Sequence, residues 1–122
     1  MFDDSGPIYQ QVAAQIEDQI LRGALRGDDQ VMSTNAYASH YRINPATAAK
    51  GFRRLVDDGI LYKRRGLGMF VSPDARDRLR ARRRSRFFSE RVDPVIAEAG
   101  MIGVPLDDVI KHIEDLRDGD AR

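Results

Sequence analysis

The stretch RINPATAAKGFRRLVDDGILYKRR, residues 42–65, decides the fold because it contains the start, the apolar face and the end of one helix. Asn44 is a favourable N-cap, since its side-chain oxygen can accept from a free amide of the first turn. Pro45 suits the first helical position, and Gly59 follows the last turn, where a left-handed C-cap favours glycine. Between them, apolar residues recur at helical spacing, namely Ala48, Phe52, Leu55 and Val56. The sequence therefore predicts a helix of about four turns from Pro45 to Asp58.

The opposite face of this helix is cationic. Residues 42–65 hold seven basic residues against two acids, a net charge of +5. A surface helix with cationic and hydroxyl side chains can enter the DNA major groove, where it meets phosphates and guanine edges. A solvated charged face is the alternative for the helix taken alone, and the flanking elements favour DNA binding. The candidate DNA-binding residues of this stretch are Asn44, Thr47, Lys50, Arg53, Arg54, Lys63, Arg64 and Arg65.

The residues before this stretch predict two further helices. Apolar side chains at positions 8, 12, 16 and 20 predict an amphipathic helix from Pro7 to about Arg22. Residues 30–32 have the composition of a very short strand, and Ser33 is a good N-cap for a second helix that ends at His40. Two short helices separated by a tight turn, the second one basic, form a helix-turn-helix.

The residues after the basic helix predict a β-hairpin. Residues 60–63 and 69–71 have strand composition, and the connection Arg64–Gly68 contains two glycines that permit a tight turn. A hairpin directly after the basic helix forms a wing, whose arginines can follow phosphates or lie in the minor groove. The fold class expected is mainly α with a small β-hairpin, with an N-terminal winged helix-turn-helix followed by a short α-helical dimerisation tail.

Composition restricts the class of protein. The 122 residues suffice for one domain with a short appendage, and they contain no cysteine, which fits a cytoplasmic location. No apolar run approaches the roughly 20 residues that span a bilayer. His40 and His112 are isolated, and no acidic cluster has metal-ligand or acid–base spacing. We therefore expect no enzyme activity, no catalytic residues, no metal and no cofactor.

The pattern of residues 7–71 resembles the GntR family of bacterial transcription regulators. The resemblance rests on PIYQQVAAQIEDQILRG from Pro7 and on INPATAAK, DDGIL and RRGLGMFV further along. It implies operator contacts at Ser33, Thr47, Lys50, Arg64, Arg65, Gly66 and Gly68. The chain departs from the family's usual Leu-Pro-Ser motif, and Asn35 stands where the family often has a phosphate-binding arginine. The short tail resembles the YtrA-like subgroup.

The C-terminal region predicts two amphipathic helices, and Pro94 should kink or briefly break the first of them. Two such helices cannot bury their apolar faces on each other alone, so a second copy of the chain would cover them. We expect residues 1–73 to form the DNA-binding domain and residues 74–122 to form the dimerisation region. The apolar residues assigned to the dimer are Phe87, Phe88, Val92, Val95, Ile96, Leu106, Val109, Ile110 and Ile113. The alternative is a tail that folds back onto its own DNA-binding domain.

Residues 76–91 hold eight arginines and a net charge of +6, and residues 92–122 have a net charge of −5. The arginines have three interpretations: contact with DNA, by Arg76 and Arg78 above all, pairing with the acidic tail, or solvation. Overall the sequence predicts a homodimeric repressor that binds a palindromic operator. The alternatives are a winged-helix adaptor for proteins and an architectural DNA binder without sequence preference. A small-molecule effector would bind in the dimer groove or between the two regions, and would act by favouring one spacing of the DNA-binding domains.

Overall fold

The computed structural model describes residues 2–119, so residues 1 and 120–122 of the two expected domains lie outside it. The described residues divide into two compact units, one up to Ala81 and one from Arg82 onward. The expected functional boundary after residue 73 stays a prediction. Both units are built mainly from helices, and the first contains one two-stranded antiparallel sheet. The expected fold class, mainly α with a small β-hairpin, is confirmed, and the dimerising role of the tail stays a prediction.

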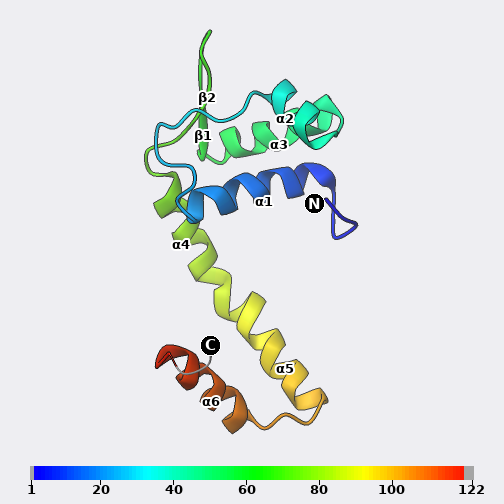
Figure 1. Cartoon of the computed structure of the whole chain (residues 1–122), viewed down its shortest axis with the longest axis vertical. Coiled ribbons are helices and arrows are strands. Elements are labelled where there is room, and N and C mark those ends of the chain that lie inside the picture. The colour runs from blue at the N-terminus through cyan, green and yellow to red at the C-terminus, as the bar shows by residue number, and fades with distance from the viewer. Residues whose placement is uncertain (1, 120–122) are drawn as a thin grey trace. The chain divides into compact units, whose positions relative to one another are not determined.

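The first unit is organised around α3 (Pro45–Asp57), which packs against α1 (Ile8–Leu21) and α2 (Thr34–Tyr41) (Figure 1). The predicted apolar face of α3 forms the centre of the core, where Phe52 and Leu55 are fully buried. Loss of a buried phenylalanine side chain costs about 3–5 kcal/mol of stability. The core is completed by buried residues of the other elements, among them Val12, Ile16, Ile20, Val71 and Leu79.

The ends of the helices agree with the predicted caps. Asn44 Oδ1 accepts from the Ala46 amide at 2.7 Å, and Ser33 Oγ accepts from the Ala36 amide at 3.1 Å. Gly59 has φ +77°, the left-handed conformation expected after α3. Arg42 also has a positive φ, +56°, and closes the turn between α2 and α3. These two helices with their tight turn form the helix-turn-helix.

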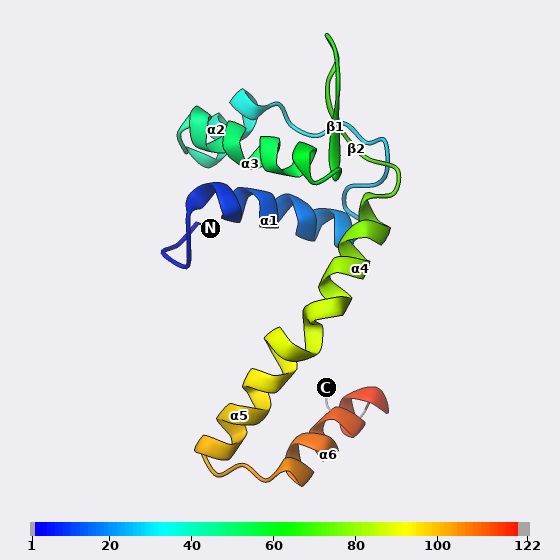
Figure 2. The same cartoon turned by 180° about the vertical axis from the view of Figure 1, so that it is seen from behind.

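The wing is the hairpin of β1 (Leu61–Arg64) and β2 (Gly68–Val71), which projects beyond the helices of its unit (Figure 2). Its register pairs Leu61 with Val71 and Arg64 with Gly68. The predicted strand at residues 30–32 is wrong, since Gln30 forms only an isolated bridge to Phe70. Residues 28–31 instead bond to β2 through single backbone contacts that do not continue as a strand.

The second unit contains the last part of α4 (Ala75–Phe87), the π-helical turn η1 (Phe88–Val92), α5 (Asp93–Met101) and α6 (Leu106–Arg117). The helix does not break at Pro94. A proline ring clashes with the carbonyl of the preceding turn, and here a wider turn, in which the Asp93 amide donates to the Phe88 carbonyl, comes immediately before it. Pro94 then lies in the first turn of α5, directly after this wider turn. The α5 and α6 helices form a helical hairpin (Figures 1 and 2).

Candidate nucleic-acid interface

The exposed face of α3 carries the predicted cationic residues. Lys50, Arg53 and Arg54 are exposed, and Thr47 is half-buried beside them. Arg54 Nε lies 4.0 Å from Asp58 Oδ2, an exposed pair one turn apart that contributes little to stability. The guanidinium groups are therefore accessible to an anionic partner.

The two capping side chains keep hydrogen-bonding capacity beyond their caps. Ser33 and Asn44 are both exposed and both accept from an amide of their own helix. The acceptor role leaves the Ser33 hydroxyl hydrogen and the Asn44 amide hydrogens available as donors. Such donors at helix N-termini bind phosphate oxygens, and the helix dipole adds to the attraction.

Lys50 does not project freely from α3. Its Nζ lies 4.1 Å from the centre of the Tyr9 ring on α1, a cation–π contact. The Tyr9 hydroxyl accepts from Gln10 Nε2 at 3.2 Å. Tyr9 is thus a neighbour of the candidate site that the sequence pattern did not identify. It lies 41 positions before Lys50, and no local motif signals the contact.

The tip of the wing brings together the predicted residues of the hairpin. Lys63, Arg64, Arg65 and Gly66 are exposed, and the guanidinium carbon of Arg64 lies 5.5 Å from the centre of the Phe70 ring. Gly66 has φ +78° and Gly68 has φ +119°, conformations that favour glycine. The wing therefore presents three cations around a turn whose backbone depends on two glycines.

The base of the wing is fixed by side chains that the sequence pattern also did not identify. The Tyr62 hydroxyl donates to Asp28 Oδ1 at 2.7 Å, and this bond raises the pKa of Tyr62 above its ordinary value. Gln30 Nε2 donates to the Leu67 carbonyl at 2.8 Å. Both partners come from the segment before α2, more than thirty positions away along the chain.

The first arginines of the run bind within the first unit. Arg76 Nη2 donates to the Leu21 carbonyl at 3.1 Å, and Arg78 Nη1 donates to the Asp58 carbonyl at 3.2 Å. These carbonyls lie at the C-terminal ends of α1 and α3, where a cation is favoured by the helix dipole. Both arginines thus cap helices of the winged domain, a role absent from the three interpretations of the run.

The second unit exposes an apolar groove of about 430 Å³ between α5 and α6. Most residues assigned to the dimer line it, namely Phe87, Val92, Val95, Ile96, Leu106, Val109, Ile110 and Ile113. Phe88 is not among its lining residues, although its ring is 68% exposed and contacts Phe87 edge to face. No residue of α6 is buried.

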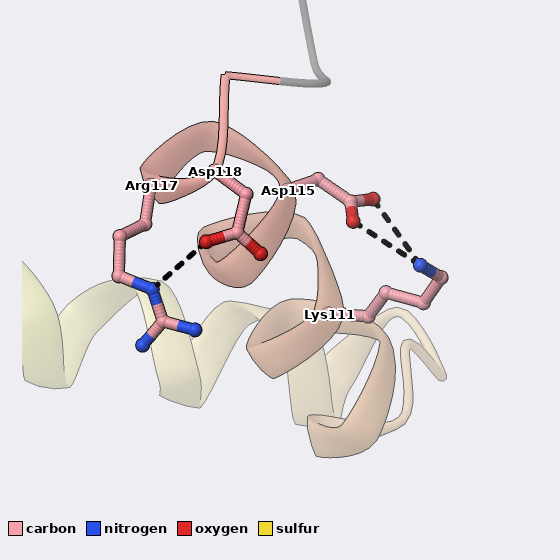
Figure 3. A network of polar contacts seen from close by, with 4 residues as sticks. All are labelled: Lys111, Asp115, Arg117 and Asp118. Carbon is pink, nitrogen blue, oxygen red and sulfur yellow. Dashed lines mark hydrogen bonds and ion pairs between the residues drawn. The ribbon is translucent and has the colours of Figure 1, made fainter.

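The polar face of α6 is partly neutralised within the helix. Lys111 Nζ lies 3.1 Å from Asp115 Oδ1, and Arg117 Nε lies 3.3 Å from Asp118 Oδ1 (Figure 3). These pairs lie on residues that do not line the groove. The charged face of α6 is therefore suited to solvent, whereas its apolar face is left without cover in a single chain.

Residues 2–119 contain no group of three or more His, Cys, Asp or Glu side chains placed to hold a metal ion. None of their helices is both long and apolar enough to cross a bilayer.

Comparison with known proteins agrees with this geometry, although no family model matches the chain. The chain is 28% identical over 112 residues to the transcriptional repressor YtrA of Bacillus subtilis, covering 92% of this chain and 85% of that protein. A GntR-family regulator from Listeria monocytogenes has a similar structure, with a TM-score of 0.75 and 25% identity over 93% of this chain and 98% of that one. The DNA-binding domain of AraR, solved in complex with operator ORR3, matches 59% of this chain and 87% of its own length with 28% identity and a TM-score of 0.54. The chain is therefore similar over most of its length to the transcriptional repressor YtrA and to a GntR-family transcriptional regulator of known structure.

Proposed function

We propose that this regulator is a repressor that binds a palindromic operator as a homodimer. The observation that carries the proposal is the exposed cationic face of α3, which lies in one unit with a wing that carries three further cations. In this arrangement α3 enters the major groove, and the wing contacts phosphates or the minor groove beside it. Repression is inferred from the similarity to YtrA, which is named as a repressor.

The residues proposed to contact DNA fall into two classes. Thr47 and Lys50, near the start of α3, would contact base edges and so discriminate among sequences. The remaining residues would contact phosphates and set the overall affinity. They are Ser33, Asn44, Arg53, Arg54, Lys63, Arg64, Arg65, Gly66 and Gly68.

We further propose that residues 1–73 bind DNA and that residues 74–122 dimerise. The uncovered groove between α5 and α6 supports this division. Ile110, Ile113 and Leu116 of α6 are each more than half exposed in the single chain, which is unfavourable for side chains of this size. A second copy that packs its α5 and α6 on the same surface would bury both sets in a symmetric four-helix arrangement. Such a dimer holds two α3 helices about one helical turn of DNA apart.

Selection of bound fragments from random DNA duplexes tests the proposal directly. A repressor of this kind enriches an inverted repeat with half-sites about 10 base pairs apart, centre to centre. Enrichment of no sequence at all, with uniform affinity for every duplex, would indicate an architectural DNA binder. Absence of binding at low salt, where phosphate contacts are strongest, would favour a protein adaptor.

Repression itself needs a separate measurement. A reporter gene whose promoter overlaps the selected inverted repeat should be expressed less when the protein is present. The Arg64→Ala, Arg65→Ala double variant serves as the control, since it should restore expression while the protein stays folded. Higher expression with the parent protein than without it would show activation instead.

A further inference from the structure

The side chain of Gln30 reaches the tip of the wing. Its Nε2 donates to the carbonyl of Leu67 at 2.8 Å, across 37 positions of the chain. Leu67 lies in the turn that also contains Arg65 and Gly66, and the Leu67 amide closes this turn by donating to the Arg64 carbonyl at 2.9 Å. The Gln30 amide group is therefore bonded directly to the turn that carries the wing arginines.

Gly68 leaves the space that this contact needs. A Cβ placed on Gly68 would lie 2.8 Å from Gln30 Nε2, closer than a real Cβ contact allows. Gly68 also has φ +119°, which other residues rarely adopt. Any side chain at position 68 would thus displace the Gln30 amide as well as strain the backbone.

The backbone around Gln30 is held firmly against β2. The Asp28 amide donates to the Val71 carbonyl at 2.7 Å, and the Val31 amide donates to the Met69 carbonyl at 2.9 Å. These bonds fix the lower part of the hairpin. Among the contacts described for residues 28–31, the bond from Gln30 is the one that reaches the turn.

We propose that Gln30 is a positioning residue for DNA binding, which holds the wing turn so that Arg64 and Arg65 meet the DNA in a fixed arrangement. A two-stranded hairpin is only marginally stable by itself, and a turn with two glycines has considerable freedom. A bond that orders the turn before binding lowers the entropy that is lost on binding. The inference rests on the proposed function, because Gln30 acts here only through the wing.

The first test measures the wing without DNA. Gln30→Met keeps the length of the side chain and removes the amide donor, so the amides of Leu67 and Gly68 should exchange with solvent hydrogen faster than in the parent. Gln11→Met is a matched control, since Gln11 Nε2 also donates to backbone carbonyls, those of Asp3 and Gly6, at 2.8 and 2.9 Å. The control should leave exchange in the wing unchanged. Unchanged exchange in Gln30→Met would overturn the inference.

The second test measures affinity for the inverted repeat selected from random duplexes. Gln30→Met should weaken binding about two- to tenfold for each copy of the chain in the complex, the range expected for loss of one hydrogen bond, at a temperature where both proteins are folded. Arg65→Ala should weaken binding as well, and the double variant should lose little more than Arg65→Ala alone. Such non-additivity is expected only if Gln30 acts through the arginine.

The failures of the two proposals can be told apart. If Arg65→Ala weakens binding and Gln30→Met does not, the positioning role is wrong and the proposed function stands. If losses from the two variants add fully, Gln30 does not act through Arg65, and the positioning role is again wrong. If neither Arg64→Ala nor Arg65→Ala affects affinity, the wing does not bind DNA, and both the wing contacts and the role of Gln30 are overturned.

Discussion

The ammonium nitrogen of Lys50 lies 4.1 Å from the centre of the Tyr9 ring, so a residue of α1 contacts a cation on the exposed face of α3. The α1 and α3 helices approach closely at this point. A Cβ added to the adjacent Gly51 would lie only 2.8 Å from the Tyr9 carbonyl oxygen. The close packing of α1 against α3 therefore sets the position of the Lys50 backbone, and the Tyr9 ring orients the Lys50 side chain. If Lys50 contacts DNA as proposed, Tyr9 restricts where its positive charge lies.

Replacement of Tyr9 should weaken operator binding through Lys50. An exposed cation–π contact contributes about 0.5–1 kcal/mol, so Tyr9→Leu should lower affinity about two- to fivefold for each copy of the chain in the complex. Tyr9→Phe keeps the ring and should bind like the parent. Both affinities can be measured by fluorescence anisotropy with a labelled inverted repeat. Equal losses in the two variants would assign the effect to the hydroxyl group instead of the ring.

Residues in α3 and in the wing should differ in what they do to specificity. Thr47→Ala and Lys50→Ala should reduce discrimination between the operator and duplexes with single base changes, because these side chains are proposed to contact base edges. Arg64→Ala and Arg65→Ala should weaken binding to all duplexes alike, and each should reduce the slope of log affinity against log salt by about 0.9 for each copy of the chain, which is about 1.8 for the proposed dimer. A salt series on operator and mismatched duplexes separates the two effects. If all four variants keep the parent's affinity and slope, the assigned interface is wrong.

The helices and the hairpin could be predicted from the sequence because their signals are local. Asn44, Pro45 and Gly59 act within one turn of the residues they cap, and the apolar spacing of α3 requires no partner to be recognised. The exposed cations of α3 and the wing could be predicted for the same reason. Their direct DNA contacts stay a prediction.

The long-range contacts could not be predicted in this way. Gln30 reaches Leu67, and Arg76 reaches the end of α1, across 37 and 55 positions respectively. A pattern of neighbouring residues carries no information about contacts between residues far apart in the sequence. For this reason residues 30–32 were predicted as a strand, whereas Gln30 forms only an isolated bridge to Phe70. The sequence of the arginine run likewise does not show that its first members cap helices.

Gly51 should be intolerant of alanine although it lies within a helix. An added Cβ would lie 2.8 Å from the Tyr9 carbonyl oxygen and from Val12 Cγ1, so α1 and α3 would have to separate. Overpacking of this kind costs about 1–3 kcal/mol, which exceeds the gain of about 1 kcal/mol in helix propensity. Urea unfolding should therefore show lower stability for Gly51→Ala.

Gly100→Ala is the matched control for Gly51→Ala. Gly100 also lies within a helix, α5, and no described atom lies within 4 Å of the position of its added Cβ. This variant should keep or raise stability, since only the helix propensity changes. A Gly51→Ala protein as stable as the parent would show that α1 and α3 do not need their close approach.

Charge placed in the apolar groove should separate the two copies of the chain. Ile110 and Ile113 line the groove and are 52% and 58% exposed in the single chain, so aspartates there remain solvated in a monomer. In the proposed dimer the same carboxylates would be buried without partners, which costs several kcal/mol for each ion. Analytical ultracentrifugation should show a dimer for the parent and a monomer for the Ile110→Asp, Ile113→Asp variant.

His112→Asp is the control, because His112 is exposed on the same helix and does not line the groove. It adds one negative charge, where the double variant adds two, and should leave the dimer intact. A dimer that persists in the double variant would place the interface elsewhere, whereas a monomeric parent would remove the basis for a palindromic operator.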